Sequence, residues 1–140
     1  MTDVHDTATR SYNMSRIRSK DTKPEISVRQ YLHSRGFRFS LNKKSLPGKP
    51  DIYLRKYNTV ILIHGCFWHG HKGCKYFVLP KTRSTWWKEK IDRNAENDYK
   101  KTVELKKLRL NVIVIWECDL KREKFEKTMS RLVKNIKRHG

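Results

Sequence analysis

Eleven consecutive residues, 64–74, hold most of the side chains in this sequence that could bind a transition metal. The segment reads HGCFWHGHKGC and places three histidines and two cysteines around a phenylalanine and a tryptophan. Cysteine and histidine at such short spacing are typical of tetrahedral zinc sites. Imidazole can also transfer protons near neutral pH. The segment therefore predicts either a zinc loop that only holds the fold together or a working surface.

The sequence offers more ligands than one zinc ion can use, since tetrahedral zinc takes four. The candidates are the cysteines and histidines of the loop together with one distant cysteine: Cys66, His69, His71, Cys74, Cys118 and, as a sixth, His64. At least one histidine is left over, and the spacing alone does not select it. A surplus imidazole beside a zinc loop is a candidate for proton transfer.

The aromatic residues of this region also allow two interpretations. Phe67 and Trp68 lie between the candidate ligands, and Trp86 and Trp87 begin a basic helical pattern. Large aromatic residues are commonly buried, so ordinary core packing is the simpler interpretation. Rigid rings on a cationic surface can instead stack on bases or wedge into a base step.

The charge of the chain predicts a polyanionic partner. Lysine and arginine number 33 against 14 acidic residues, which gives a formal net charge of +19. Nucleic acid is the first candidate for neutralising this charge and a membrane surface the second. No apolar run approaches the roughly 20 residues that span a bilayer. The polar N-terminus resembles no signal or transit peptide, so we expect a cytoplasmic protein, not bound to a membrane, with reduced cysteines.

The hydrophobic pattern predicts one α/β domain over residues 1–140 with a mixed sheet. Residues 1–21 are expected to form an N-terminal arm and 122–140 a basic C-terminal helix. Between them we expect a capped helix at 21–36, strands at 37–42, 51–55 and 59–65, one or two helices at 84–110, and a strand at 111–118. Cys118 would end that last strand.

The second and third strands are separated by only three or four residues, which predicts an antiparallel hairpin. A three-residue loop sets Asp51 opposite Ile63, and a four-residue loop sets it opposite His64. Either register brings a carboxylate, a backbone oxygen and an imidazole to one edge of the sheet. A hard cation such as Mg²⁺ can use such an oxygen site.

Five ordered blocks of the chain resemble the very short patch repair DNA mismatch endonucleases. They extend from about residue 3 to 120 and read DVHDTATRSYNM, LPGKPDIYL, HGCFWHGHKGCKYF, TRSTWWKEKI and VIVIWEC. The resemblance implies the PD-(D/E)XK restriction-endonuclease-like fold, in which helices flank a central mixed β-sheet, with a structural zinc site. It implies a Mg²⁺-dependent enzyme that nicks double-stranded DNA on the 5′ side of the thymine in a T·G mismatch, a product of 5-methylcytosine deamination.

The resemblance also implies roles for individual residues. The catalytic residues would be Asp51, His64, His69, Glu25 and Asp98. Mg²⁺ would be held by Asp51 and the backbone of Ile63, and Zn²⁺ by Cys66, His71, Cys74 and Cys118, which makes His69 the surplus imidazole. The DNA contacts would be an aromatic wedge beside the mismatch and one residue entering from the opposite groove: Phe67, Trp68, Trp87 and Met14.

The sequence departs from the family pattern at three places. Ile63 stands where threonine is frequent, one extra residue precedes Cys74, and ILI at 61–63 replaces the (D/E)XK half of the nuclease signature. Two other functions compete with mismatch nicking: a non-catalytic zinc module that binds nucleic acid, and a restriction-type nuclease that cuts matched duplex. The resemblance further implies a monomer in a prokaryotic cytoplasm, associated with the nucleoid, with mismatch-repair proteins and a cytosine-5 methyltransferase as candidate partners.

Overall fold

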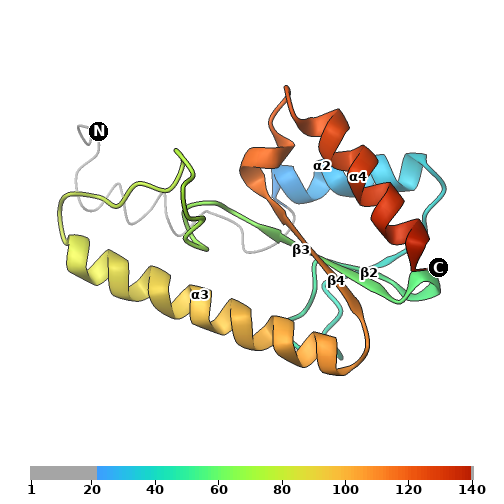
Figure 1. Cartoon of the computed structure of the whole chain (residues 1–140), viewed down its shortest axis with the longest axis horizontal. Helices are drawn as coiled ribbons and strands as arrows, with labels where there is room; N and C mark the ends of the chain where they lie inside the picture. The colour runs from blue at the N-terminus through green and yellow to red at the C-terminus, as the bar shows by residue number, and fades with distance from the viewer. Residues whose placement is uncertain (1–21, 140) are drawn as a thin grey trace.

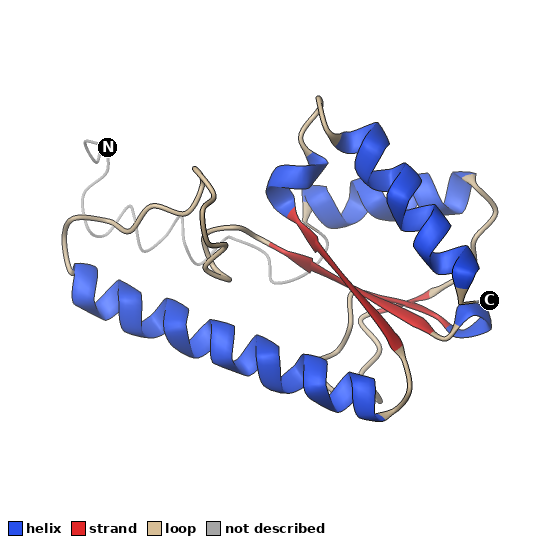
Figure 2. Cartoon of the chain, viewed as in Figure 1, coloured by secondary structure: helices blue, strands red, loops and turns tan. Residues whose placement is uncertain are grey.

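The computed structural model describes residues 22–139, so the N-terminal arm predicted at 1–21, Met14 included, lies outside the described residues. The elements in chain order are α2 (Lys23–Ser34), β1 (Ser40–Leu41), β2 (Ile52–Leu54), the 3-10 helix η1 (Arg55–Tyr57), β3 (Thr59–His64), α3 (Ser84–Lys107), β4 (Asn111–Trp116), the 3-10 helix η2 (Glu117–Leu120) and α4 (Phe125–Arg138). Figure 1 labels them, and Figure 2 separates helix from strand by colour.

A four-stranded mixed sheet in the order β1-β2-β3-β4 is the centre of the fold. β1, β2 and β3 pair antiparallel, whereas β3 and β4 run parallel. Every residue of β3 is buried, as expected for an apolar run between two neighbouring strands. The predicted α/β class with a mixed sheet flanked by helices is confirmed.

The two faces of the sheet pack against different helices (Figure 1). Ile61 and Ile63 belong to the core that α2 and α4 cover, whereas Val60 and Leu62 pack with Leu105 of α3. Side chains alternate between the faces of a strand. His64 therefore falls on the same face as Val60 and Leu62, toward α3.

Helix α2 lies within the capped helix predicted at 21–36 and has a recognisable signal at each end. The hydroxyl of Thr22 accepts a hydrogen bond from the Glu25 N–H at 3.4 Å, and Pro24 occupies the first turn. Gly36 follows the helix at φ +86°, a left-handed conformation that glycine adopts without strain. This start fixes Glu25 in the first turn, where its side chain is buried.

Both hairpin registers predicted from the sequence are wrong. Leu54 pairs with Thr59 and Ile52 with Ile61, so continuing the ladder sets Asp51 opposite Leu62. The reason is the loop, because η1 takes Arg55 out of the strand and Asn58 closes the turn at φ 52°. The loop therefore holds four residues, 55–58, one of which the prediction had assigned to the strand.

Other elements also end at unexpected residues. The strand predicted at 37–42 is reduced to β1, and the region 84–107 forms one helix. β4 ends at Trp116, so Cys118 lies in η2 and not on the strand. None of the helices within residues 22–139 is long and apolar enough to span a membrane.

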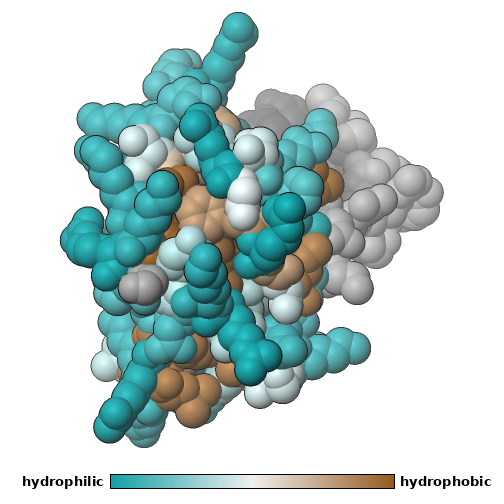
Figure 3. Space-filling view, turned by 90° about the vertical axis from the view of Figure 1, so that its right-hand side faces the viewer, coloured by the Kyte–Doolittle hydropathy of each residue, from teal (hydrophilic) through white to brown (hydrophobic). Residues whose placement is uncertain are grey.

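The surface seen from the right of Figure 1 is dominated by hydrophilic side chains (Figure 3). Helix α4 buries Met129, Leu132 and Ile136. Its outward positions are mostly basic and exposed: Lys127, Arg131, Lys134, Lys137 and Arg138. The formal charge of +19 is thus carried partly on this face.

Candidate active site and metal centre

Four side chains from the 66–74 loop and η2 converge on one point. The donor atoms of Cys66, His71, Cys74 and Cys118 all lie within 4.8 Å of one another. Although Cys118 is not on the strand, the turn of η2 brings its N–H to Cys66 Sγ at 3.3 Å. The set is the one that the resemblance implies for zinc, and it leaves His69 outside.

The spacing of these atoms fits a tetrahedral metal. Zn–S bonds of about 2.3 Å and Zn–N bonds of about 2.0–2.1 Å at tetrahedral angles separate sulfur and nitrogen by about 3.5 Å. Cys118 Sγ and His71 Nδ1 are 3.5 Å apart. Burial raises the pKa of the Cys66 thiol to about 12, so a nearby cation is needed to hold it as a thiolate at neutral pH.

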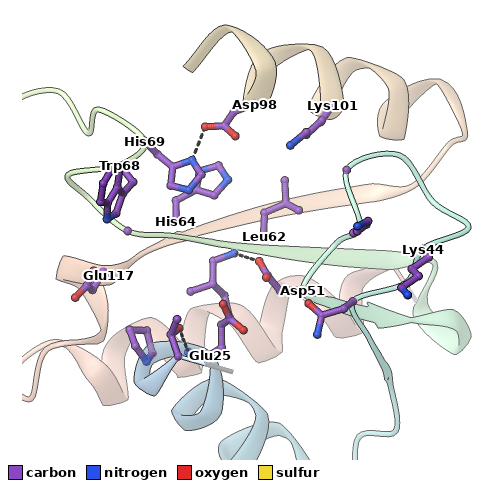
Figure 4. A pocket seen from close by; sticks show the side chains of 17 residues that line it. Glu25, Lys44, Asp51, Leu62, His64, Trp68, His69, Asp98, Lys101 and Glu117 are labelled. Atoms are coloured by element: carbon purple, nitrogen blue, oxygen red, sulfur yellow. Dashed lines mark hydrogen bonds and ion pairs between the residues drawn. The ribbon is translucent and has the colours of Figure 1, made fainter. Parts of the chain in front are cut away.

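The second group of chemical interest lines a cleft of about 970 Å³. Figure 4 shows the cleft between α3, the C-terminal end of β3 and the first turn of α2. Its walls carry all five residues for which the resemblance implies a catalytic role: Glu25, Asp51, His64, His69 and Asp98. The fold therefore brings together residues that are separated by more than seventy positions in the sequence.

Asp51 reaches Ile63 with its side chain and not through the predicted strand pairing. Its Oδ2 accepts a hydrogen bond from the Ile63 N–H at 2.6 Å. In the observed register Pro50 stands opposite Ile63, and proline has no N–H to donate to the Ile63 carbonyl. The N–H and C=O of one strand residue point to the same side. The Ile63 carbonyl and the Asp51 carboxylate therefore share this edge, which suits a hard cation.

The electrostatics of Asp51 also suit a cation. Burial raises the pKa of Asp51 from the ordinary 3.8 to about 6. The negative charge of Glu25 also raises this pKa, whereas the hydrogen bond from Ile63 and the positive charge of Arg29 lower it. Glu25 is 4% exposed and forms an ion pair with Arg29, whose guanidinium donates a hydrogen bond to Glu25 Oε2 at 3.1 Å. Near pH 7 Asp51 is mostly ionised but poorly solvated, a state that a divalent cation stabilises.

Two imidazoles and a carboxylate form a compact group across the cleft from Asp51. The rings of His64 and His69 stack with their centroids 4.0 Å apart and their planes 5° apart. Asp98 Oδ2 lies 2.5 Å from His69 Nδ1 and holds that ring by one of its nitrogens (Figure 4). The side chains of His64, His69 and Asp98 are also close enough together to bind a metal ion. The Nδ1 atom of His69, however, already pairs with the Asp98 carboxylate.

The two histidines differ in their environments. Burial and the neighbouring His69 lower the pKa of His64 to about 4, so His64 is neutral near pH 7. Its Nδ1 is buried and has no hydrogen-bond partner among residues 22–139. His69 is more accessible, with 28% of its side chain exposed. Only His69 therefore combines access to the cleft with a carboxylate that orients it.

One stripe of α3 supports both the cleft and the loop. Asn94 donates a hydrogen bond to the Trp68 carbonyl at 3.0 Å, and Asp98, four residues later, holds His69. Ile91 is buried against Gly70, where a Cβ would lie 2.7 Å from the Ile91 side chain. The remaining members of the stripe follow at intervals of three and four residues: Trp87, Lys101 and Leu105.

The predicted aromatic wedge forms one cluster at the rim of the cleft. The centroid of Phe67 lies 5.3 Å from that of Trp68 and 5.5 Å from that of Trp87, and the two tryptophans are 5.8 Å apart. All three rings are partly exposed, and Trp68 also lines the cleft. They do not belong to either buried core of the described chain.

Three residues of this region were missed from the sequence. Trp116 stacks on His71 at 4.1 Å and meets His64 edge-on at 5.2 Å. Asn94 and Lys101 fall four residues before and three after Asp98, a helical spacing that could have identified them. For Trp116 the sequence shows only which face of β4 carries the side chain, through the alternation along a strand. It does not predict which loop the ring contacts.

Comparison with known proteins identifies the family of the chain. The family model of the DNA mismatch endonuclease Vsr matches residues 2–75. The type II nicking enzyme V.NmeAIP of Neisseria meningitidis is 49% identical over 138 residues, 98% of this chain and 98% of the relative. V.XorIIP of Xanthomonas oryzae is 46% identical over 86% of this chain and 88% of its own.

The DNA mismatch endonuclease Vsr of Escherichia coli is 45% identical over 125 residues, which cover 89% of this chain and 80% of the relative. The family that the five sequence blocks predict is thereby confirmed. With identity of this extent over nearly the full length of both chains, the protein belongs to the Vsr family of DNA mismatch endonucleases.

Proposed function

We propose that this protein nicks one strand of duplex DNA on the 5′ side of the thymine in a T·G mismatch. The observation that carries the proposal is the group formed by Asp51, His64 and the His69–Asp98 pair in one cleft, beside a partly exposed aromatic cluster. The names of the relatives, which include a mismatch endonuclease and several nicking enzymes, support the reaction class.

We assign Asp51 and the Ile63 carbonyl to a Mg²⁺ site, with Glu25 close enough to Asp51 to affect its charge. The bound ion would polarise the scissile phosphate and orient the attacking water. Asp51 must be ionised to serve as a ligand, and Arg29 favours that state through its positive charge. The Ile63 N–H fixes the carboxylate in one orientation, so the ligand is positioned before DNA arrives.

We assign the proton transfer to His69. Asp98 holds its Nδ1, which directs Nε2 toward the cleft and favours the tautomer that accepts a proton there. His64, neutral and buried, can donate one N–H to a phosphate oxygen without bringing a second positive charge against His69. In this assignment His69 is the general base and His64 is the hydrogen-bond donor.

We assign the mismatch preference to Phe67, Trp68 and Trp87, with Met14 as a further contact from residues outside the described range. Unstacking a base step costs a few kcal/mol, and base–aromatic stacking returns about 1–3 kcal/mol per ring. The balance favours insertion where the pair is already weakened, as in a T·G wobble pair.

The proposal includes a structural Zn²⁺ at Cys66, His71, Cys74 and Cys118, whose ligand spacing supports it. We also propose that the protein acts as a monomer in a prokaryotic cytoplasm, associated with the nucleoid. Its candidate partners are mismatch-repair proteins and a cytosine-5 methyltransferase. Zinc at this position would link the loop to η2, since three ligands come from one and the fourth from the other.

The test is a nicking assay on a T·G heteroduplex and its matched control, each with and without Mg²⁺. We expect one nick, in the strand that carries the thymine, only in the heteroduplex and only with Mg²⁺. Equal cutting of the matched duplex would favour a restriction-type nuclease. DNA binding without cleavage under any divalent metal would favour a non-catalytic zinc module.

A further inference from the structure

We propose that Lys101 of α3 binds the scissile phosphate and offsets the negative charge that develops on it during cleavage. This inference rests on the proposed nicking activity and adds to it a residue of the active site. Neither the five sequence blocks nor the nuclease signature points to this lysine.

The position of Lys101 on α3 sets its direction. The stripe that contains Asp98 and Leu105 faces the sheet, because Asp98 holds His69 and Leu105 packs on Val60 and Leu62. Lys101 is three residues from one and four from the other, so it lies on the same stripe. Figure 4 shows its side chain extending from α3 toward β3, on the side of the cleft where His64 and His69 lie.

The methylene chain of Lys101 is restrained by the loop between β1 and β2. Gly48 passes so close that a Cβ there would lie 2.8 Å from Cδ, 3.0 Å from Cγ and 3.1 Å from Cβ of Lys101. Gly48 also has φ +73°, which glycine adopts without strain. Lys101 is exposed, but the contact with Gly48 on one side leaves its stem fewer conformations, so less entropy is lost when its ammonium binds an anion.

The acidic side chains of the cleft make a nearby positive charge important for binding a phosphate. The walls of the cleft carry Glu25, Asp51, Asp98 and Glu117, whose carboxylates repel an incoming phosphodiester. Within residues 22–139 the Lys101 ammonium has no ion pair or hydrogen bond, and its side chain lines the same cleft as His64 and His69. Lys44 and Lys49 also line the cleft, but they belong to the loop between β1 and β2, whereas Lys101 belongs to α3, on the stripe that contains Asp98. A cation placed in such a cleft can stabilise the negative charge that develops in the transition state.

Lys100 provides a matched control. It is the next residue on the same helix, but it pairs with Glu96 at 3.4 Å, and both side chains are 64% exposed. Lys101→Met and Lys100→Met each remove one positive charge from α3, and methionine keeps most of the apolar stem. The two variants therefore differ in whether the lost charge faces the cleft.

The experiment measures the single-turnover nicking rate on a T·G heteroduplex with saturating enzyme and Mg²⁺, and the Kd for the same duplex with Ca²⁺ in place of Mg²⁺. We expect Lys101→Met to lower the rate by about 10- to 100-fold, and Lys101→Arg to restore most of it. Lys100→Met should leave the rate unchanged. The Kd should weaken at least as much in Lys101→Met as in Lys100→Met, but by a much smaller factor than the nicking rate of Lys101→Met.

An unchanged rate in Lys101→Met, an equal loss in Lys100→Met, or no rescue by arginine would overturn the role of Lys101. Lys101→Gln gives a second neutral variant should the methionine protein not fold. Absence of nicking by the unsubstituted protein would instead refute the proposed function, so the two failures are distinguishable.

Discussion

Replacing Asp51 with asparagine should stabilise the metal-free protein while abolishing its activity. The amide oxygen of asparagine can still accept the Ile63 N–H that Asp51 Oδ2 accepts at 2.6 Å, so the substitution removes the charge and keeps the hydrogen bond. Burial raises the pKa of Asp51 from 3.8 to about 6. A carboxyl group whose pKa is raised by folding stabilises the folded state only while it stays protonated.

The sign and size of the effect follow from that pKa. Well below pH 3.8 the carboxyl group is protonated in both the folded and the unfolded chain, so it costs nothing. The cost grows as the pH rises from 3.8 to about 6 and levels off above that at up to about 3 kcal/mol, at about 1.36 kcal/mol per pKa unit. Because the side chain is only partly buried, we expect Asp51→Asn to gain about 1–3 kcal/mol at pH 7–8 and about 0.5 kcal/mol or less at pH 4.

The assay is urea unfolding across pH 4–8 in magnesium-free buffer without a chelator, since a chelator would also remove zinc. Mg²⁺ should then stabilise the unsubstituted protein and leave Asp51→Asn unchanged, because a ligand stabilises only the state that binds it. Asp92→Asn is the control, as Asp92 pairs with Lys88 on the surface of α3 with 66% of its side chain exposed. A gain as large at pH 4 as at pH 8, or no gain at pH 8, would refute the reasoning.

Three further outcomes are expected. Asp98→Ala should lower the single-turnover nicking rate by about 10- to 150-fold, the equivalent of a charge-assisted hydrogen bond of about 1.5–3 kcal/mol to His69, while Asp92→Ala should have no effect. Elemental analysis should find about one zinc per chain, and Cys118→Ser should lower both the zinc content and the melting temperature; a folded, active, zinc-free protein would contradict this. Trp68→Ala should reduce the preference for T·G over matched DNA more than it reduces total binding, and an equal loss of both affinities at one salt concentration would contradict the wedge.

Local signals in the sequence predict the elements well. The hydroxyl of Thr22, Pro24 and Gly36 mark both ends of α2, and the apolar run of β3 predicts an interior strand. These features depend on residues close in sequence, whose backbone preferences act wherever the segment lies. The family resemblance supplies the site residues, and the geometry brings those within the described range together.

Features that depend on packing between distant segments could not be predicted in this way. The hairpin register was wrong because no pattern shows that η1 would take Arg55 from the strand. Cys118 was expected on a strand, whereas a 3-10 turn brings it to Cys66. Lys101 is a different case, since its spacing from Asp98 was readable once α3 was taken as one helix.

The candidate zinc ligands and the aromatic residues are neighbours in sequence for a physical reason. His69 and Trp68 lie between Cys66 and His71, whose backbones are joined by a 2.9 Å hydrogen bond from the His71 N–H to the Cys66 carbonyl. A metal that closes this ligand set would restrict the enclosed residues, so their entropy is lost during folding and not on binding DNA.

Trp116 extends the same restraint to the second imidazole. Its ring stacks on His71 with the planes 4° apart and meets His64 edge-on at 5.2 Å. His64 in turn stacks on His69, which Asp98 holds from α3. The candidate zinc ligands and the candidate catalytic imidazoles are thus connected through packed rings. A metal that fixes His71 would also restrict Trp116 and, through it, His64 and His69.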